Sequence, residues 1–214
     1  MNDKSINNYE VQAQTARAIF LKWDQKKLTS RLGIDSDDNF IFISFFDERY
    51  SIDRVTGEVS HCEGSGSVDY NAVMVIYDVI CNSKPEAVLS REWLTHENLN
   101  PHSNFGSMEK SLFGPAAEGF SGHVDKLKIA CASLGGFDIK KADAGFMFNV
   151  FPFLPVLFQF WEGDDEFPPK VTFHFDRNTL DFVCFESAWY IVSHLIEIIR
   201  AEMDARFSMG FYGR

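Results

Sequence analysis

Apolar residues recur at helical spacing in four stretches of the chain. The first of these stretches is carried by Val11, Ala18, Leu21 and Leu28, and Gly33 supplies a stop after it. The second is buried on most of its surface and has Ser67 as a candidate N-cap. The fourth carries a continuous apolar stripe, as in a helix packed along a core. The expected helices are residues 8–32, the segment between Ser67 and Asn82, residues 121–134, and residues 185–206.

Extended segments are indicated by alternation and by dense runs of Phe. Phe146 and Phe148 alternate with polar or flexible residues, and residues 171–175 place Thr172 and His174 opposite three apolar side chains. Residues 40–46 are apolar on both faces, which predicts a central strand. The expected strands are residues 40–46, 50–52, 58–60, 146–150, 156–161 and 171–175, with a further short strand at residues 91–93.

Several breakers separate these elements. Pro152 and Pro155 cannot donate to a strand ladder and mark a hairpin corner. Residues 90–120 look irregular, with a polar loop at residues 98–104, and Gly114-Pro115 is expected to end any short helix there. The sequence therefore predicts one α+β domain over residues 1–214, with a largely antiparallel, Phe-rich sheet and helices packed on one face.

Composition narrows the class of function. The chain has 214 residues, with 31 acidic and 20 basic side chains and a net charge of −11. Such a charge disfavours sequence-independent binding to nucleic acid and adsorption to anionic membranes, because both need a basic face. Phe occurs 22 times, and half of these lie between Phe146 and Phe185. Their position in predicted strands favours a core role.

The expected location is the cytoplasm. Residues 1–9 are polar and lack the apolar core of a signal peptide, and no stretch has the length of a transmembrane helix. The four cysteines are far apart and form no C-x-x-C pair, which is typical of reduced thiols and unlike a zinc or iron–sulfur site. They are Cys62, Cys81, Cys131 and Cys184.

An acidic turn is the strongest candidate for chemistry. Four carboxylates lie within five residues directly after the densest Phe segment: Glu162, Asp164, Asp165 and Glu166. Clustered carboxylate oxygens suit a hard cation, and two close carboxyl groups can divide acid and base roles. Asp176 lies at the end of the next predicted strand and is expected to join them. The alternative is a solvated hairpin tip.

Aromatic and basic residues frame this turn. Trp161 and Phe167, followed by two prolines, form a rim that can hold a cationic or ring-shaped ligand. His174 lies on the polar side of its strand, where it is either a ligand for a metal or tetrapyrrole or a solvent-facing residue. Arg91 is a candidate ion-pair partner for the turn.

Other motifs carry weaker signals. His96 and His102 share a loop without a recognised metal spacing, and His61-Cys62 is a soft-metal candidate without a second pair. The chain has no G-x-S-x-G elbow. Gly64-Ser-Gly66 lacks the phosphate-loop pattern and reads as a linker.

One family resemblance rests on the order of these blocks. Three blocks follow one another in the chain: Trp161-Glu-Gly-Asp-Asp-Glu-Phe-Pro-Pro169, Phe173-His-Phe-Asp176 and Phe185-Glu186. This order resembles that of an uncharacterised prokaryotic family, domain of unknown function 3786. Phe151-Pro-Phe-Leu-Pro155 is also similar to that family. The resemblance extends over residues 8–200. It implies a setting in anaerobes, where some members are joined to an iron–sulfur module like that of corrinoid proteins, and it assigns no catalytic residue.

Three functions follow from these observations. The first is a binding or accessory protein, for a small cofactor such as a corrinoid or other tetrapyrrole, or for a protein partner. The second is a carboxylate enzyme, with or without a divalent metal, in which Asp164 or Glu166 is the base and Asp176 the metal ligand. The third is an interaction subunit that forms a homodimer.

Overall fold

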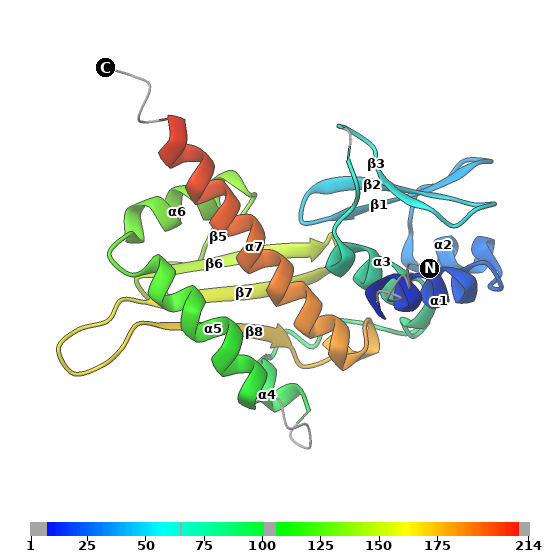
Figure 1. Ribbon diagram of the computed structural model, residues 1–214. Helices are drawn as coiled ribbons and strands as arrows, with labels where there is room; N and C mark the ends of the chain where they lie inside the picture. Colours follow the sequence, from blue (N-terminus) through cyan, green and yellow to red (C-terminus); the bar gives the residue numbers. More distant parts are fainter. Residues whose placement is uncertain (1–7, 65, 101–105, 210–214) are drawn as a thin grey trace, which may run out of the picture.

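The computed structural model describes residues 8–64, 66–100 and 106–209. Helices and antiparallel strands occupy separate stretches of this chain, so the fold is α+β as predicted (Figure 1). The elements in chain order are α1 (Asn8–Phe20), α2 (Gln25–Leu32), β1 (Phe40–Phe45), β2 (Glu48–Asp53), β3 (Val59–His61), α3 (Tyr70–Asn82), β4 (Trp93–Thr95), α4 (His96–Leu99), α5 (Gly106–Phe120), α6 (Val124–Ser133), β5 (Phe137–Asp138), β6 (Ala144–Phe151), β7 (Leu154–Trp161), β8 (Lys170–Asp176), the 3-10 turn Thr179–Asp181, and α7 (Phe185–Met209).

The strands form two antiparallel sheets, where the sequence suggested one. The first has the order β1-β2-β3 and the second β4-β8-β7-β6-β5. They meet where the N–H of Phe46, the residue after β1, donates to the carbonyl of Val150 in β6 at 3.0 Å. Figure 1 shows the smaller sheet beside the end of the larger one.

The Phe-rich strands build the core of the larger sheet. Strand register places Phe146 opposite Phe158, and Phe158 opposite Phe173, so the three rings form one row across the sheet. All three are buried. Helix α5 packs on this row, because the ring of Phe113 lies 5.1 Å from that of Phe173. Alternation of Phe with other residues thus marks the face that the helices cover.

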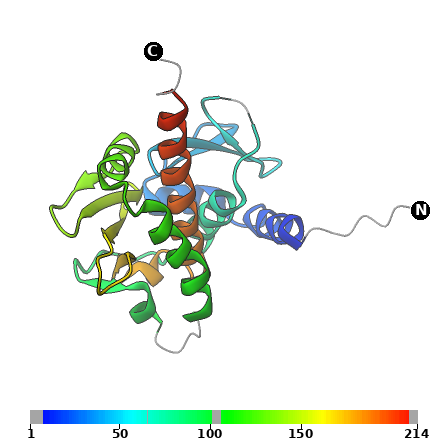
Figure 2. The ribbon, with the colours of Figure 1, turned by 60° about the vertical axis from the view of Figure 1, so that its left-hand side comes forward.

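Helices α5, α6 and α7 lie on the same side of the larger sheet (Figure 2). The predicted stripe of α7 is confirmed, since Val192, Leu195, Ile196 and Ile199 are fully buried. The other side of the sheet has no helix over it in the described part of the chain. Phe137 on that side is 68% exposed.

The predicted helix over residues 8–32 is wrong in one respect, because it is two helices. Helix α1 ends at Phe20 and is followed by a tight turn. Asp24 then caps α2 by accepting a hydrogen bond from the N–H of Lys27 at 3.3 Å. Gly33 ends α2 in the left-handed conformation, as expected. The cap of α3 is Asp69, which accepts from the N–H of Ala72 at 3.1 Å, and not Ser67.

Residues 40–46 are also placed differently from the prediction. Strand β1 is an edge strand with alternating burial, and β2 is the central strand. Phe42 suggested a second apolar face, but its ring is covered by the guanidinium of Arg49 at 4.9 Å. A partly exposed aromatic residue under a cation therefore mimics the pattern of a fully buried strand.

The expected break at Gly114-Pro115 does not occur. Helix α5 runs through both residues to Phe120. Proline removes one backbone N–H, but Ala116, Ala117 and Phe120 are buried against the sheet. The burial of these side chains therefore outweighs the low helix propensity of Gly114 and Pro115. Helix α6 starts three residues later than predicted, and the strand expected at 91–93 is Trp93–Thr95.

The structure does not describe every segment named from the sequence. Ser65 in the connector at 63–67, and residues 101–105 with His102, lie outside the described residues. None of the helices in the described ranges is long and apolar enough to cross a membrane.

Candidate functional site

The acidic turn joins β7 to β8, and we call residues 162–169 the acidic hairpin. Glu162 accepts hydrogen bonds from the Ser121 hydroxyl and from the N–H of Gly122 at 2.8 Å. It thereby fixes the link between α5 and α6. Asp164 accepts from the N–H groups of Glu166 and Phe167, both at 2.8 Å. Two of the four carboxylates therefore hold backbone in place.

Both of these carboxyl groups ionise more readily than usual. The hydrogen bond from Ser121 lowers the pKa of Glu162. The N–H groups of Glu166 and Phe167 lower the pKa of Asp164. Division of acid and base roles needs two carboxyl groups whose pKa values move apart. Both pKa values are lowered, so neither group is shifted toward the raised pKa that a general acid needs.

A cavity of about 520 Å³ opens beside the acidic hairpin. Trp161, Phe167, Pro168 and Pro169 line it, as the aromatic rim predicted. Trp161 is 38% and Phe167 67% exposed. Asp165 and Glu166 are exposed at the hairpin tip. Ligand binding by these residues stays a prediction.

The structure does not bring Asp176 to the acidic hairpin. The two lie at opposite ends of β8, which separates them by about 20 Å. Asp176 is buried and accepts from the N–H groups of Ser90, Arg91 and Asn178 at 2.9, 2.6 and 2.9 Å. Burial opposes its ionisation, but these backbone donors outweigh burial and lower its pKa.

Arg91 lies at that same distant end. Its N–H binds Asp176 and its backbone adopts a positive φ of 64°. The predicted pairing of an arginine with the acidic hairpin is therefore wrong. Arg177 instead forms an ion pair with Glu92, with Nη2 2.5 Å from Oε2.

His174 lies near the middle of β8, on the side of the sheet away from the helices. Register places it opposite Leu157 in β7 and Thr95 in β4. Its Nδ1 is buried without a hydrogen-bond partner among the described residues. Burial, followed by the charges of Lys141 and Lys170, lowers the pKa of His174. The imidazole is therefore neutral at pH 7.

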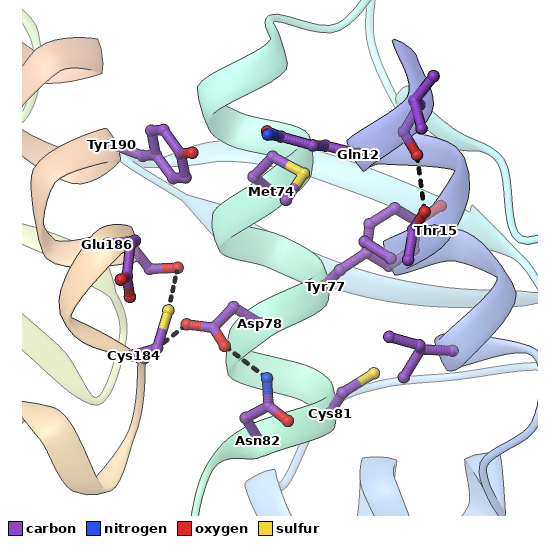
Figure 3. Close-up of a pocket in the computed structure, with 14 residues that line it drawn as sticks. Gln12, Thr15, Met74, Tyr77, Asp78, Cys81, Asn82, Cys184, Glu186 and Tyr190 are labelled. Atoms are coloured by element: carbon purple, nitrogen blue, oxygen red, sulfur yellow. Dashed lines mark hydrogen bonds between the residues drawn. The ribbon is translucent and has the colours of Figure 1, made fainter. Parts of the chain in front are cut away.

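A second cavity, of about 460 Å³, lies between α1, α3 and the start of α7, and we call it the helical groove (Figure 3). Helix α3 forms its floor with side chains spaced three or four residues apart, which face the same side. The floor includes Met74 and Asp78. Gln12 and Thr15 stand on the α1 wall, and Cys184 and Tyr190 on the α7 wall.

Asp78 is the polar centre of the helical groove. It is 8% exposed. Its Oδ2 accepts from the N–H of Cys184 at 2.7 Å, and its Oδ1 accepts from Nδ2 of Asn82 at 2.6 Å. These bonds tie the start of α7 to α3 and leave the carboxylate pointing between the two helices (Figure 3).

The charged side chains that line the helical groove, among the described residues, are all acidic. Asp78 and Glu186 line it, and no lysine or arginine does so among the residues that the structure describes. The two lining thiols add no anion. Burial raises the pKa of Cys81 to about 12 and that of Cys184 to about 11, so both are protonated at pH 7. The groove therefore presents carboxylates within mainly apolar walls.

Sequence reasoning missed this groove. Its walls come from residues as far apart as Thr15 and Tyr190, and local patterns do not show such pairing. One signal was present: Asp78 is the sole charged residue between Tyr70 and Asn82. A charge inside an apolar helix is costly unless it is hydrogen-bonded, so it marks a special position.

The side chains that the sequence suggested as metal ligands do not lie together in the described part of the chain. In the described part of the chain, no group of three or more His, Cys, Asp and Glu side chains is placed to hold a metal ion. His61 is bound to Glu48, with Nδ1 2.5 Å from Oε1. His96 is buried against the ring of Phe113.

Comparison with known proteins identifies the family. A family model described as a domain of unknown function, DUF3786, matches residues 24–198. The chain belongs to this family. The match confirms the resemblance seen in the sequence, and it includes the acidic hairpin and the α3 and α7 walls of the helical groove, while α1 precedes it. No curated protein and no solved structure matches the chain.

Proposed function

We propose that this DUF3786 member is a binding protein that holds a small organic cation in the helical groove. One observation carries the proposal: a buried carboxylate, Asp78, forms the floor of an apolar cavity that has no basic side chain among its described lining. Ligand sites commonly combine apolar walls with a few convergent polar groups.

Asp78 keeps capacity for a ligand. Its carboxylate accepts hydrogen bonds from Asn82 and from the backbone N–H of Cys184, and the Cys184 thiol also bonds to it. Because the two oxygens together have four acceptor positions, one remains for a ligand. An ammonium group would bind there by a charge-assisted hydrogen bond. Tyr77 and Tyr190 supply aromatic surface for the rest of the ligand.

The groove suits a small ligand and not a tetrapyrrole. A volume of about 460 Å³ lies in the lower half of the range for sites of drug-sized molecules. The groove does contain side chains of the types that ligate haem iron, namely Met74 and two tyrosines, so its small volume alone argues against a tetrapyrrole. A tetrapyrrole at His174 stays a prediction, which visible spectra with added haem or cobalamin would test.

The test compares two probes that share a ring and differ in charge. Tryptamine carries an ammonium group and indole-3-acetate a carboxylate. Protein NMR titration should show tryptamine shifting the amides of Met74, Asp78 and Tyr190, with indole-3-acetate having little effect. Asp78→Asn should weaken tryptamine binding roughly 10- to 100-fold, the usual range for a lost charge-assisted hydrogen bond.

Two controls separate binding from folding. Asn at position 78 still accepts from the N–H of Cys184, and the amide of Asn82 can rotate to meet it, so this variant should fold. Asp125→Asn, exposed on α6, should bind tryptamine like the wild type. Thr15→Trp, on the exposed α1 wall, should block the groove. Equal response to both probes, or none, would overturn the proposal.

A further inference from the structure

The larger sheet has one side that the helices leave uncovered, and we call it the open face. The aromatic residues Trp93, Phe137 and Trp161 are 37%, 68% and 38% exposed there. Met147, which is partly exposed, and Leu157, which is 8% exposed, lie between them, opposite each other in the strand register. Large aromatic residues around an apolar centre are typical of surfaces that bind another protein.

The residues at the centre of the open face carry no fixed charge, whereas Lys170, opposite Trp161 in the strand register, is an exposed cation toward the hairpin end of the same side. His174 is neutral because burial lowers its pKa, and Thr172 and Gln159 face each other across β8 and β7. Covering these groups with a second surface would not remove an ionised group from water. Dimer formation through these residues therefore avoids the desolvation of a charged group, which is the largest free-energy cost of burying polar residues in an interface.

Charges of opposite sign flank this centre at one end of the sheet. The acidic hairpin carries exposed Asp165 and Glu166 at its tip. The loop between β5 and β6 carries Lys141, which forms no ion pair among the described residues and acts electrostatically on His174. This loop lies at the same end as the hairpin, because the N–H of Asp143 donates to the carbonyl of Phe160 at 3.0 Å.

We propose that two copies of this chain form a dimer through the open face. A two-fold axis that runs along the strands, between the acidic hairpin and the Lys141 loop, exchanges these two segments. Each copy then places Asp165 and Glu166 against Lys141 of the other. Such an interface is isologous, since one patch that carries both signs complements itself. A partner that is only acidic would leave the hairpin facing like charge.

The size of the open face fits a reversible dimer. Strand β7 has eight residues and the sheet has five strands. Because the outer strands β4 and β5 have only three and two residues, the plane measures roughly 440 Å² at about 3.3 Å per residue and 4.8 Å between strands. Projecting aromatic side chains and the hairpin tip add to this area, and a standard interface covers about 800 Å² per partner. A dissociation constant in the micromolar range is the expected result.

Sedimentation equilibrium of the full chain tests the dimer. The wild type should change from monomer to dimer as its concentration rises through the micromolar range, and salt should weaken association. Lys141→Glu and Asp165→Lys should each weaken it about tenfold or more. The double variant should recover most of the loss, because the pair is restored with exchanged signs.

Matched variants separate the interface from general surface effects. Trp161→Ala should weaken the dimer, whereas Trp23→Ala, at a somewhat more exposed tryptophan outside the open face, should leave it unchanged. Lys26→Glu, on α2, is the control for charge reversal. A wild type that stays monomeric at high micromolar concentration overturns the proposal. A dimer that Trp161→Ala and Lys141→Glu leave intact overturns it as well.

Discussion

The acids of the β7–β8 region and the acid of the helical groove differ in what surrounds them. Glu162, Asp164 and Asp176 accept backbone N–H groups from loops, and each has a lowered pKa. Asp78 also accepts one backbone N–H, that of Cys184, but it is buried within an apolar helix and lines the helical groove. Acidic residues gather in a turn because their oxygens satisfy turn backbone. A dense acidic cluster is therefore weaker evidence for a binding site than one isolated acid.

Among these acids, the largest loss of stability is expected for Asp176→Ala. Replacement by Ala removes the acceptor for three backbone N–H groups and the Ser90 hydroxyl in a buried position. Buried donors left without partners should cost at least about 3 kcal/mol of unfolding free energy. Urea denaturation measures the loss, and tryptamine binding should stay unchanged in the folded variant.

Asp181→Ala is the matched control for that measurement. Asp181 lies in the following turn, where its carboxylate pairs with Lys84 at 2.5 Å near the surface. An exposed ion pair contributes less than about 1 kcal/mol. Equal losses for the two variants would contradict the structural role assigned to Asp176.

The pH dependence of stability sharpens the same comparison. His96 and His174 have pKa values lowered by burial, so the unfolded chain binds their protons first and stability falls as the pH drops below about 6.5. Glu162, Asp164 and Asp176 also have lowered pKa values. The stability they supply is complete above the unfolded pKa of about 4 and is lost as the pH falls through their folded values.

Urea titrations at a series of pH values test this dependence. The wild type should lose stability in two steps between pH 7 and acid, first with the histidines and then with the carboxylates. Asp176→Ala should lack part of the second step only. A stability that rises as the pH falls from about 6.5 would contradict the histidine assignment.

The sequence predicted the larger sheet well because its signal is local. Phe146, Phe158 and Phe173 lie in strands whose period of two marks one buried face. Division into two sheets depends on pairing between distant strands, which no local pattern carries. Packing overrode local preference at Pro115, and a cation over Phe42 imitated a second buried face.

The candidate site was less predictable than the fold. The aromatic rim at Trp161 was found, but Asp176 was expected beside the acidic hairpin although seven strand residues carry it to the far end. The helical groove is built from three helices, α1, α3 and α7, that are far apart in the sequence. The lone charge of Asp78 was its one local sign.

The smallest loss of stability is expected for a substitution of Glu162. Glu162→Gln keeps an acceptor for the Ser121 hydroxyl or the N–H of Gly122 and loses the charge. Because the side chain is partly exposed to solvent, the loss should stay below about 1 kcal/mol. Thermal or urea unfolding beside Glu118→Gln, an exposed acid on α5, measures it. Unchanged stability combined with weaker tryptamine binding would move the site from the groove to the acidic hairpin, and would reverse the comparison between the two regions.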